Sequence, residues 1–333
     1  AAARGGEGAW GHDLHLDGPQ LLWALGSRRA TGRQAAASLP ALLVSCGVPS
    51  AALLRELAPH GRSSSTATRE LVAIAIGCAA PAHMDAAAAD GGADGSVAVV
   101  AAGLASVLPL TADGSVPVVL GALFAVQTLL DGLGGWGLGG AHHAPQHPQQ
   151  LQQHPQLQQQ LGAALAAVAG ASHAPLPKDS PHAAQLRIAA CGALGAALPL
   201  ASHSTVSPLL EPLADAAAAA ASHEPDDAHG GLVRLAGAAL LGQIARSPLH
   251  HDAAVRLASH DAVHAALPLL LLQASHPEDD RRAAHAEALG ALAPLVGLPA
   301  TLGGLQPTTD VGGAEHSGQL RAAAAALQAA HGG

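Results

Sequence analysis

Long apolar segments alternate with short polar stretches along most of the chain, and the apolar segments have helical rather than strand character. They are rich in Ala, Leu and Gly, and the polar stretches between them carry Pro, Asp or Ser. Asp-Gly pairs in "ADGSVAVV" (93–100) and "ADGSVPVV" (112–119) indicate turns, and we expect Ser96 and Ser115 to cap the helices that follow. The pattern predicts pairs of helices, each of about 13–16 residues, joined by short turns.

One helix pattern recurs along the chain at a nearly constant step. Copies begin at positions separated by 48, 70, 47 and 47 residues, namely Arg69, Pro117, Arg187, Arg234 and Arg281. The long step contains "AHHAPQHPQQLQQHPQLQQQ" (141–160), and removing about 22 residues of it restores a step near 48, within the range of helical repeats. We therefore expect 141–160 to be a disordered Gln/His/Pro-rich insertion, since it is too polar to bury a core.

The segment 265–293, "AALPLLLLQASHPEDDRRAAHAEALGALA", resembles a repeat of the HEAT and armadillo families. It has a Pro-bearing apolar first helix, a polar turn, Arg281, paired alanines and then Ala-Leu-Gly. The resemblance covers about 65–300 and implies an all-α fold, a right-handed α-solenoid of stacked helical hairpins. It also implies that Arg187, Arg234 and Arg281 reach acidic or carbonyl groups of a neighbouring repeat.

These observations predict a division of the chain into repeat regions and connecting segments. A single hairpin is not stable alone, because it buries its apolar sides only against the next hairpin of the repeat region. The expected organisation is a flexible N-terminal segment (1–20), N-terminal helical repeats (21–140), the insertion (141–160), C-terminal helical repeats (161–298), a Gly/Thr-rich loop (299–318) and a terminal helix (319–333).

Composition excludes several classes of partner and location. The formal net charge of −9 and the 12% of charged residues argue against nucleic acid, which requires clustered Lys and Arg. The apolar stretches 97–110 and 116–130 are shorter than the roughly 20 residues of a membrane span, so we expect buried helices rather than membrane insertion. Three isolated cysteines indicate free thiols and an intracellular, cytoplasmic location. The chain begins without Met, and we expect it to be a fragment of a longer protein.

Motifs of catalysis and cofactor binding are missing from the sequence. His260 and His264 are spaced to share a helix face, but no H-E-x-x-H, G-x-S-x-G or G-x-x-x-x-G-K-[ST] occurs. We therefore expect no enzyme activity, no cofactor, no metal and no small-molecule substrate. The stretch "GRSSSTATRE" (61–70) presents hydroxyls beside Arg62 and Arg69, and it is a candidate acceptor of phosphate.

Repetition without catalytic motifs favours a non-catalytic scaffold for protein–protein interaction. The second helix of each hairpin is expected to line the binding surface, and its polar positions are the expected contacts: Gln243, Arg246, His285 and Glu287. The alternative is a helical-repeat domain of an enzyme or of an RNA-associated factor. An enzyme requires converging His, Asp and Arg in a pocket, and an RNA-associated factor requires a basic face.

Overall fold

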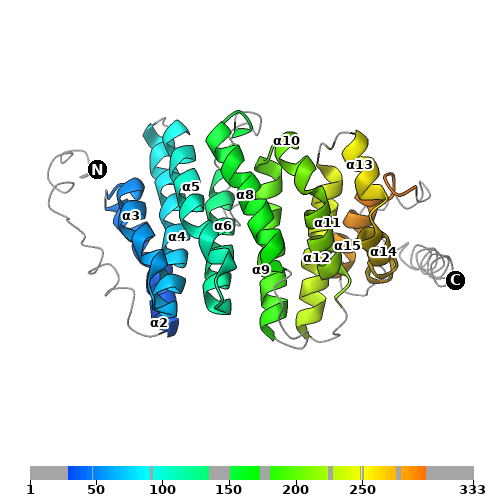
Figure 1. The fold of residues 1–333 in the computed structure, drawn as a ribbon, viewed down its shortest axis with the longest axis horizontal. Helices are drawn as coiled ribbons and strands as arrows, with labels where there is room; N and C mark the ends of the chain where they lie inside the picture. Colours follow the sequence, from blue (N-terminus) through cyan, green and yellow to red (C-terminus); the bar gives the residue numbers. More distant parts are fainter. Residues whose placement is uncertain are drawn as a thin grey trace. The chain divides into compact units, whose positions relative to one another are not determined.

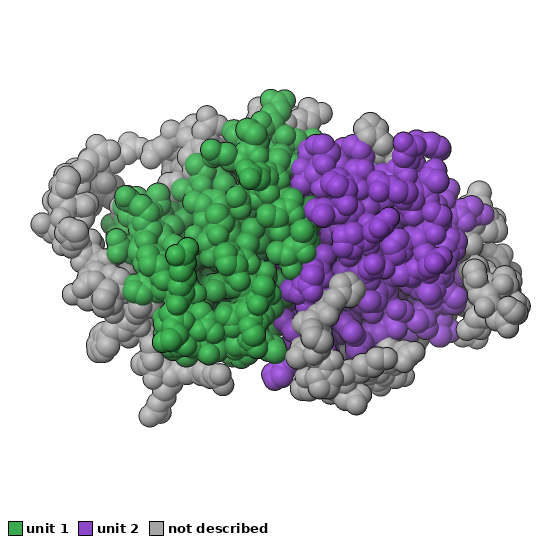
Figure 2. All heavy atoms as spheres, in the orientation of Figure 1, with its two compact units in different colours: residues 1–167 green, residues 168–333 purple. Residues whose placement is uncertain are grey.

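The computed structural model describes residues 29–46, 48–90, 93–134, 151–172, 181–223, 228–247, 249, 251–274 and 279–297. All regular elements in these residues are helices, and none of them is a strand. The chain divides into two compact units, residues 1–167 and 168–333, which Figure 2 colours separately.

In unit 1, longer helices alternate with shorter ones along the chain. Its described elements are α2 (Arg29–Ser45), α3 (Ser50–Leu57), the 3₁₀ helix η1 (Ala58–Arg62), α4 (Thr66–Asp90), α5 (Ala93–Val107), η2 (Leu108–Ala112) and α6 (Val116–Gly134) (Figure 1). The long helix α4 packs between α2 and α6, and α3 and α5 also pack on α4. The helices α2, α4 and α6 therefore form a row, which we call row 1.

The core of row 1 is built from small and branched apolar side chains. Val72, Ala73 and Ile76 of α4 and Ala122 and Val126 of α6 are completely buried. Alanine and glycine at the crossing allow the two backbones to come close, which compensates for the small area that each side chain buries. Unit 1 therefore obtains its core from close helix packing rather than from large aromatic residues.

Unit 2 repeats this arrangement with an additional short helix in each repeat. Its described elements are α9 (Pro181–Ala197), η3 (Leu198–Leu200), α10 (His203–Val206), η4 (Ser207–Leu209), α11 (Leu210–Ala221), α12 (Ala228–Arg246), α13 (His251–Ala258), α14 (Asp261–Gln273) and α15 (Asp279–Leu292). The helix α12 packs against α9, α11 and α15, so α9, α12 and α15 form row 2. The recurring segments that begin near Arg187, Arg234 and Arg281 are the helices of this row.

The first half of each unit-2 repeat is more complex than the expected single helix. In the last described repeat, α13 and α14 are separate helices at an angle of 66° to each other, and α15 completes a set of three. In the preceding repeat, the short α10 and η4 come before α11 and α12. A repeat of 47 residues in unit 2 thus contains three helical segments, whereas the repeat of 48 residues in unit 1 divides the same length between the two longer helices α5 and α6 and the short η2.

The expectation that 141–160 is a disordered insertion is wrong for the second half of this segment. The helix α8 (Pro155–Ser172) begins inside it, and Leu151, Leu157 and Leu161 are buried to 1% exposure or less. The physical reason is that glutamine is a good helix former, and the leucines among the glutamines supply an apolar side to bury. Residues 141–150 lie outside the described residues, as do the segments 1–20, 299–318 and 319–333.

The expected cap at Ser96 is also wrong, because α5 already begins at Ala93. Ser115 does directly precede α6. The Ser115 N–H donates a hydrogen bond to the Asp113 carboxylate at 2.9 Å. The turn before α6 is therefore organised by the aspartate of the Asp-Gly pair rather than by the serine hydroxyl alone.

Candidate functional site

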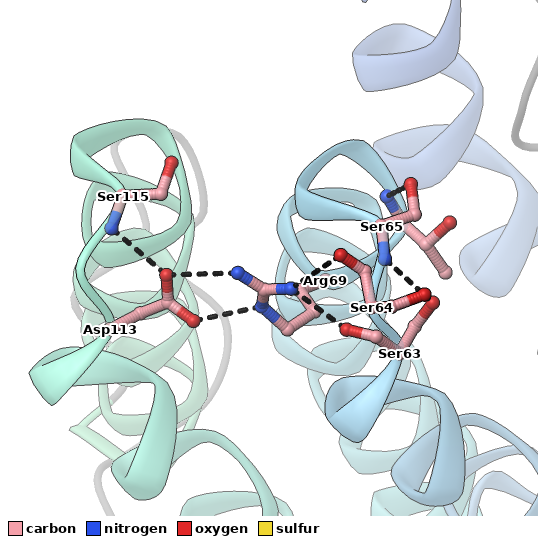
Figure 3. A network of polar contacts seen from close by, with 7 residues as sticks. Ser63, Ser64, Ser65, Arg69, Asp113 and Ser115 are labelled. Carbon is pink, nitrogen blue, oxygen red and sulfur yellow. Dashed lines mark hydrogen bonds and ion pairs between the residues drawn. The ribbon is translucent and has the colours of Figure 1, made fainter.

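Arg69 at the start of α4 joins its own entry loop to the next repeat (Figure 3). Its Nε and Nη2 donate to the two carboxylate oxygens of Asp113, at 2.8 and 3.1 Å. Its Nη1 donates to the carbonyl oxygens of Ser63 and Ser64, at 2.8 and 3.2 Å. This paired geometry, in which one guanidinium holds both carboxylate oxygens, is the strong form of an ion pair.

The Arg69–Asp113 contact changes the acidity of Asp113. The hydrogen bond from Arg69 is the largest cause that lowers the pKa of this carboxyl, and the Ser115 N–H and the charge of Arg69 lower it further. Partial burial opposes these effects, but the net pKa is below the usual 3.8. Asp113 is therefore ionised at neutral pH and remains paired with Arg69.

The next residue, Glu70, connects α4 to the other neighbour in row 1. Its carboxylate accepts a hydrogen bond from Arg33 of α2. The Glu70 side chain is 4% exposed, whereas the Arg33 side chain is 49% exposed. Two adjacent residues of α4 thus bind different neighbours, because Arg69 contacts Asp113 in the turn before α6 and Glu70 contacts Arg33 of α2.

In row 2, two of the three arginines expected to have a structural role converge on His223, which follows α11. Arg187 of α9 contacts the His223 Nδ1 at 2.6 Å. Arg234 of α12 is buried and donates to the His223 backbone carbonyl at 3.0 Å. Arg187 therefore meets an imidazole rather than the expected acidic or carbonyl group, whereas Arg234 meets a carbonyl as expected, in the loop before its own helix. The Arg281 side chain lies outside the described residues.

The expected partner contacts in row 2 lie in different environments. Arg246 and Glu287 form an ion pair between α12 and α15, and their side chains are 45% and 56% exposed. The Gln243 Oε1 is buried, and a Cβ on Gly195 of α9 would lie only 2.9 Å from it. His285 is 1% exposed, so the expectation that it contacts a partner is wrong. Its position in the helix does not reveal that neighbouring elements cover it.

Exposed apolar side chains on the row helices were missed by the sequence reasoning. Leu42 of α2 is 59% exposed, Phe124 of α6 is 44% exposed and Leu232 of α12 is 48% exposed. Phe124 is the only phenylalanine of the chain, and that rarity was the available signal. Two further exposed apolar residues, Val255 and Leu272, lie on α13 and α14, outside the rows.

The histidines considered as a pair contact different partners. His260 Nε2 lies 3.6 Å from a carboxylate oxygen of Asp215, and His264 Nε2 lies 2.6 Å from the carbonyl oxygen of Ala258. Within the described residues, no group of three His, Cys, Asp or Glu side chains is placed to hold a metal ion.

Two helices are long and apolar enough to cross a membrane by length and composition. They are the segments Val116–Leu133 in α6 and His182–Leu200 in α9 with η3, and the bent pair α13 and α14 would add a third if it formed one span. Slightly more than half of each of the two segments, 56%, is buried inside the protein. The segment Val116–Leu133 is thus longer than the stretch 116–130, which was expected to be too short to span a membrane.

Comparison with solved structures assigns the fold. The chain is similar to the designed armadillo repeat protein YIII(Dq)4CqI, with a TM-score of 0.52 and 16% sequence identity. The match covers 82% of this chain and 99% of the designed protein. The fold is armadillo-like. This confirms the expected all-α fold of the HEAT/armadillo class.

Comparisons at the level of sequence give no closer relative. No protein-family profile matches the chain, and no curated protein matches it significantly. The low sequence identity to the designed protein shows the shared fold alone, because many functions are carried by one fold. The exposed side chains of the row helices are therefore the evidence that bears on function.

Proposed function

We propose that this armadillo-like chain is a non-catalytic scaffold that binds protein partners on the outward faces of its row helices. The observation that carries the proposal is the exposure of large apolar side chains on those helices. Leu42, Phe124 and Leu232 each expose between 44% and 59% of their surface. Apolar and aromatic anchors of this kind supply most of the binding energy in protein interfaces, and rows of repeated helices commonly mediate protein binding.

The polar groups beside these anchors suit a protein partner better than a nucleic acid. Arg246 has its charge balanced by Glu287, and both are exposed enough to contact a ligand. Asp131 follows Phe124 by seven residues on α6, and burial raises the pKa of its carboxyl while a hydrogen bond from Gln127 partly lowers it. A half-buried carboxylate would repel phosphate, and the chain carries a formal charge of −9.

The cysteines and the two long apolar segments are the observations that bear on location and membrane association. Cys46, Cys78 and Cys191 are free thiols, which supports the proposal of a reducing, cytoplasmic compartment. The partial burial of the two long apolar segments supports their role as packing helices, so we infer no membrane insertion.

Substitution of the anchors by charged residues tests the scaffold proposal. Phe124→Asp and Leu232→Asp, combined in one chain, are expected to abolish capture of partners from an extract of the native cell. Val255→Asp is the matched control, because Val255 is equally exposed at 51% but lies on α13, outside the rows. Proteins retained by the wild type and by the control, and lost from the double variant, are the expected result, with thermal melting to show that all three chains are folded.

The opposite results would contradict the proposal. If the double variant captured the same proteins as the wild type, the row faces would not be the binding surface. If only the control lost its partners, the surface would lie on α13 and not on the rows.

A further inference from the structure

The loop before α4 contains three consecutive serines whose hydroxyls have different roles. The Ser65 Oγ accepts a hydrogen bond from the Thr68 N–H at 3.3 Å, and the Ser63 Oγ accepts one from the Ser65 N–H at 3.2 Å. Ser64 is exposed, and its backbone carbonyl, rather than its hydroxyl, accepts the hydrogen bond from Arg69. Of the three, the Ser64 hydroxyl is therefore the one that reacts without removing a hydrogen bond of the loop.

Two arginines are close to Ser64, Arg62 in the sequence and Arg69 through its bond to the Ser64 carbonyl. Arg62 precedes Ser64 by two residues and is exposed. The guanidinium of Arg69 is held against the Ser64 main chain by the 3.2 Å bond to its carbonyl oxygen, and the same guanidinium holds Asp113 of the next repeat (Figure 3). A negative group added to Ser64 would thus lie next to a cation that already has a carboxylate partner.

We propose that Ser64 is a phosphorylation site and that its phosphate competes with Asp113 for the guanidinium of Arg69. The reaction requires ATP and a protein kinase that recognises an arginine two residues before the acceptor. The Ser64 Oγ attacks the γ-phosphorus and forms an O–P bond, while the bond from that phosphorus to the β,γ-bridging oxygen breaks. ADP leaves with the electron pair, and a base of the kinase takes the hydroxyl proton.

Phosphorylation of Ser64 would change the balance of negative charge around the Arg69 guanidinium. A phosphoserine carries about −1.5 to −2 charges and three strong acceptor oxygens, compared with the single charge of Asp113. Arg69 is anchored to the Ser63 and Ser64 carbonyls, so it reaches a phosphate on Ser64 without leaving its loop. Asp113 then loses its two hydrogen bonds and faces a second anion. Phosphorylation therefore weakens the link between α4 and the turn before α6, whereas the contact of Glu70 with Arg33 of α2 is unchanged.

Phosphoserine introduced at position 64 of the full chain by genetic encoding tests the competition. The phosphate pKa, followed by ³¹P NMR, is expected to be lower in the wild-type background than in Arg69→Gln, because Arg69 stabilises the dianion. Phosphoserine at Ser204, an exposed position on α10, is the matched control and should show no dependence on Arg69. Equal pKa values at position 64 in the two backgrounds would overturn the proposal.

A double-mutant cycle measures the effect on the repeats. The coupling between Arg69→Gln and Asp113→Asn is expected to fall at least by half when position 64 carries phosphate. An unchanged coupling would show that phosphate and Asp113 do not compete.

Treatment of the unmodified chain with an arginine-directed kinase and ATP tests the acceptor itself. Mass spectrometry is expected to locate phosphate on Ser64, and the modification is expected to decrease in Arg62→Ala and disappear in Ser64→Ala. Phosphate on Ser63 or Ser65 in place of Ser64 would overturn the assignment.

Discussion

Gly77 of α4 lies so close to Ala125 of α6 that a Cβ added to Gly77 would be only 2.6 Å from the Ala125 Cα. Both residues are buried at the crossing of the two helices. Real Cβ atoms do not approach backbone atoms this closely, so the packing distance in row 1 depends on a residue without a side chain.

Gly77→Ala is therefore expected to destabilise unit 1. Overpacking costs about 1–3 kcal/mol, and the better helix propensity of alanine returns up to about 1 kcal/mol, so a net loss of about 1–2 kcal/mol follows. Gly170→Ala is the matched control, because Gly170 is exposed in α8 and its added Cβ would meet nothing within 4 Å. The control is expected to stabilise by about 0.5–1 kcal/mol in urea denaturation. A Gly77→Ala chain as stable as the control would show that the helices shift freely.

The Arg69–Asp113 pair is expected to contribute to stability in a pH-dependent manner. Arg69→Gln and Asp113→Asn should each destabilise the chain at pH 7 by about 1–2 kcal/mol, and the double variant by less than their sum. Because the folded-state pKa of Asp113 is lowered, its contribution is present above the usual pKa of 3.8 and is lost as the pH falls through the folded-state value. The difference in melting temperature between wild type and Asp113→Asn should therefore shrink below about pH 4. A constant difference down to pH 2 would contradict this role.

Substitution of His223 is expected to destabilise row 2, because this residue contacts arginines of both α9 and α12. His223→Ala removes the acceptor of Arg187 but leaves the backbone carbonyl that accepts from Arg234. Loss of one partner of a half-buried charge costs about 1–3 kcal/mol. His223→Asn should recover part of this loss, because its side-chain oxygen also accepts from a guanidinium. Val255→Thr, at an exposed site on α13, should change stability by less than about 0.5 kcal/mol. Equal stability of His223→Ala and Val255→Thr in urea denaturation would refute the role of this contact.

The three thiols are expected to react in the order of their exposure. Burial raises the pKa of Cys78 to about 11 and that of Cys191 to about 12, whereas Cys46 is exposed. Since the thiolate is the reactive form, an alkylating reagent at pH 8 should modify Cys46 first and Cys191 last. Mass spectrometry after timed quenching gives the order, and denaturation in urea should make the three rates similar. Equal rates of Cys46 and Cys191 in native buffer would mean that α9 opens readily.

The row helices and their spacing were predictable from sequence because they depend on local properties. The segments at Arg187, Arg234 and Arg281 became α9, α12 and α15, since helix propensity, apolar periodicity and the step of 47 residues are all written in the chain. A structural role for the first two arginines was also predictable, because the resemblance to HEAT and armadillo repeats implies it.

The identity of those partners and the exposed surface were decided only by the tertiary structure. Helix phase separates one side of α15 from the other, but it does not say which side a neighbour covers, so His285 was assigned to the surface although it is buried. The same limit hid Phe124 and led to the wrong assignment of 151–160, whose leucines are buried. Local sequence determines which helices form and how often they recur; burial depends on the distance between helices, and residues such as Gly77 and Ala125 set that distance only when the chain is folded.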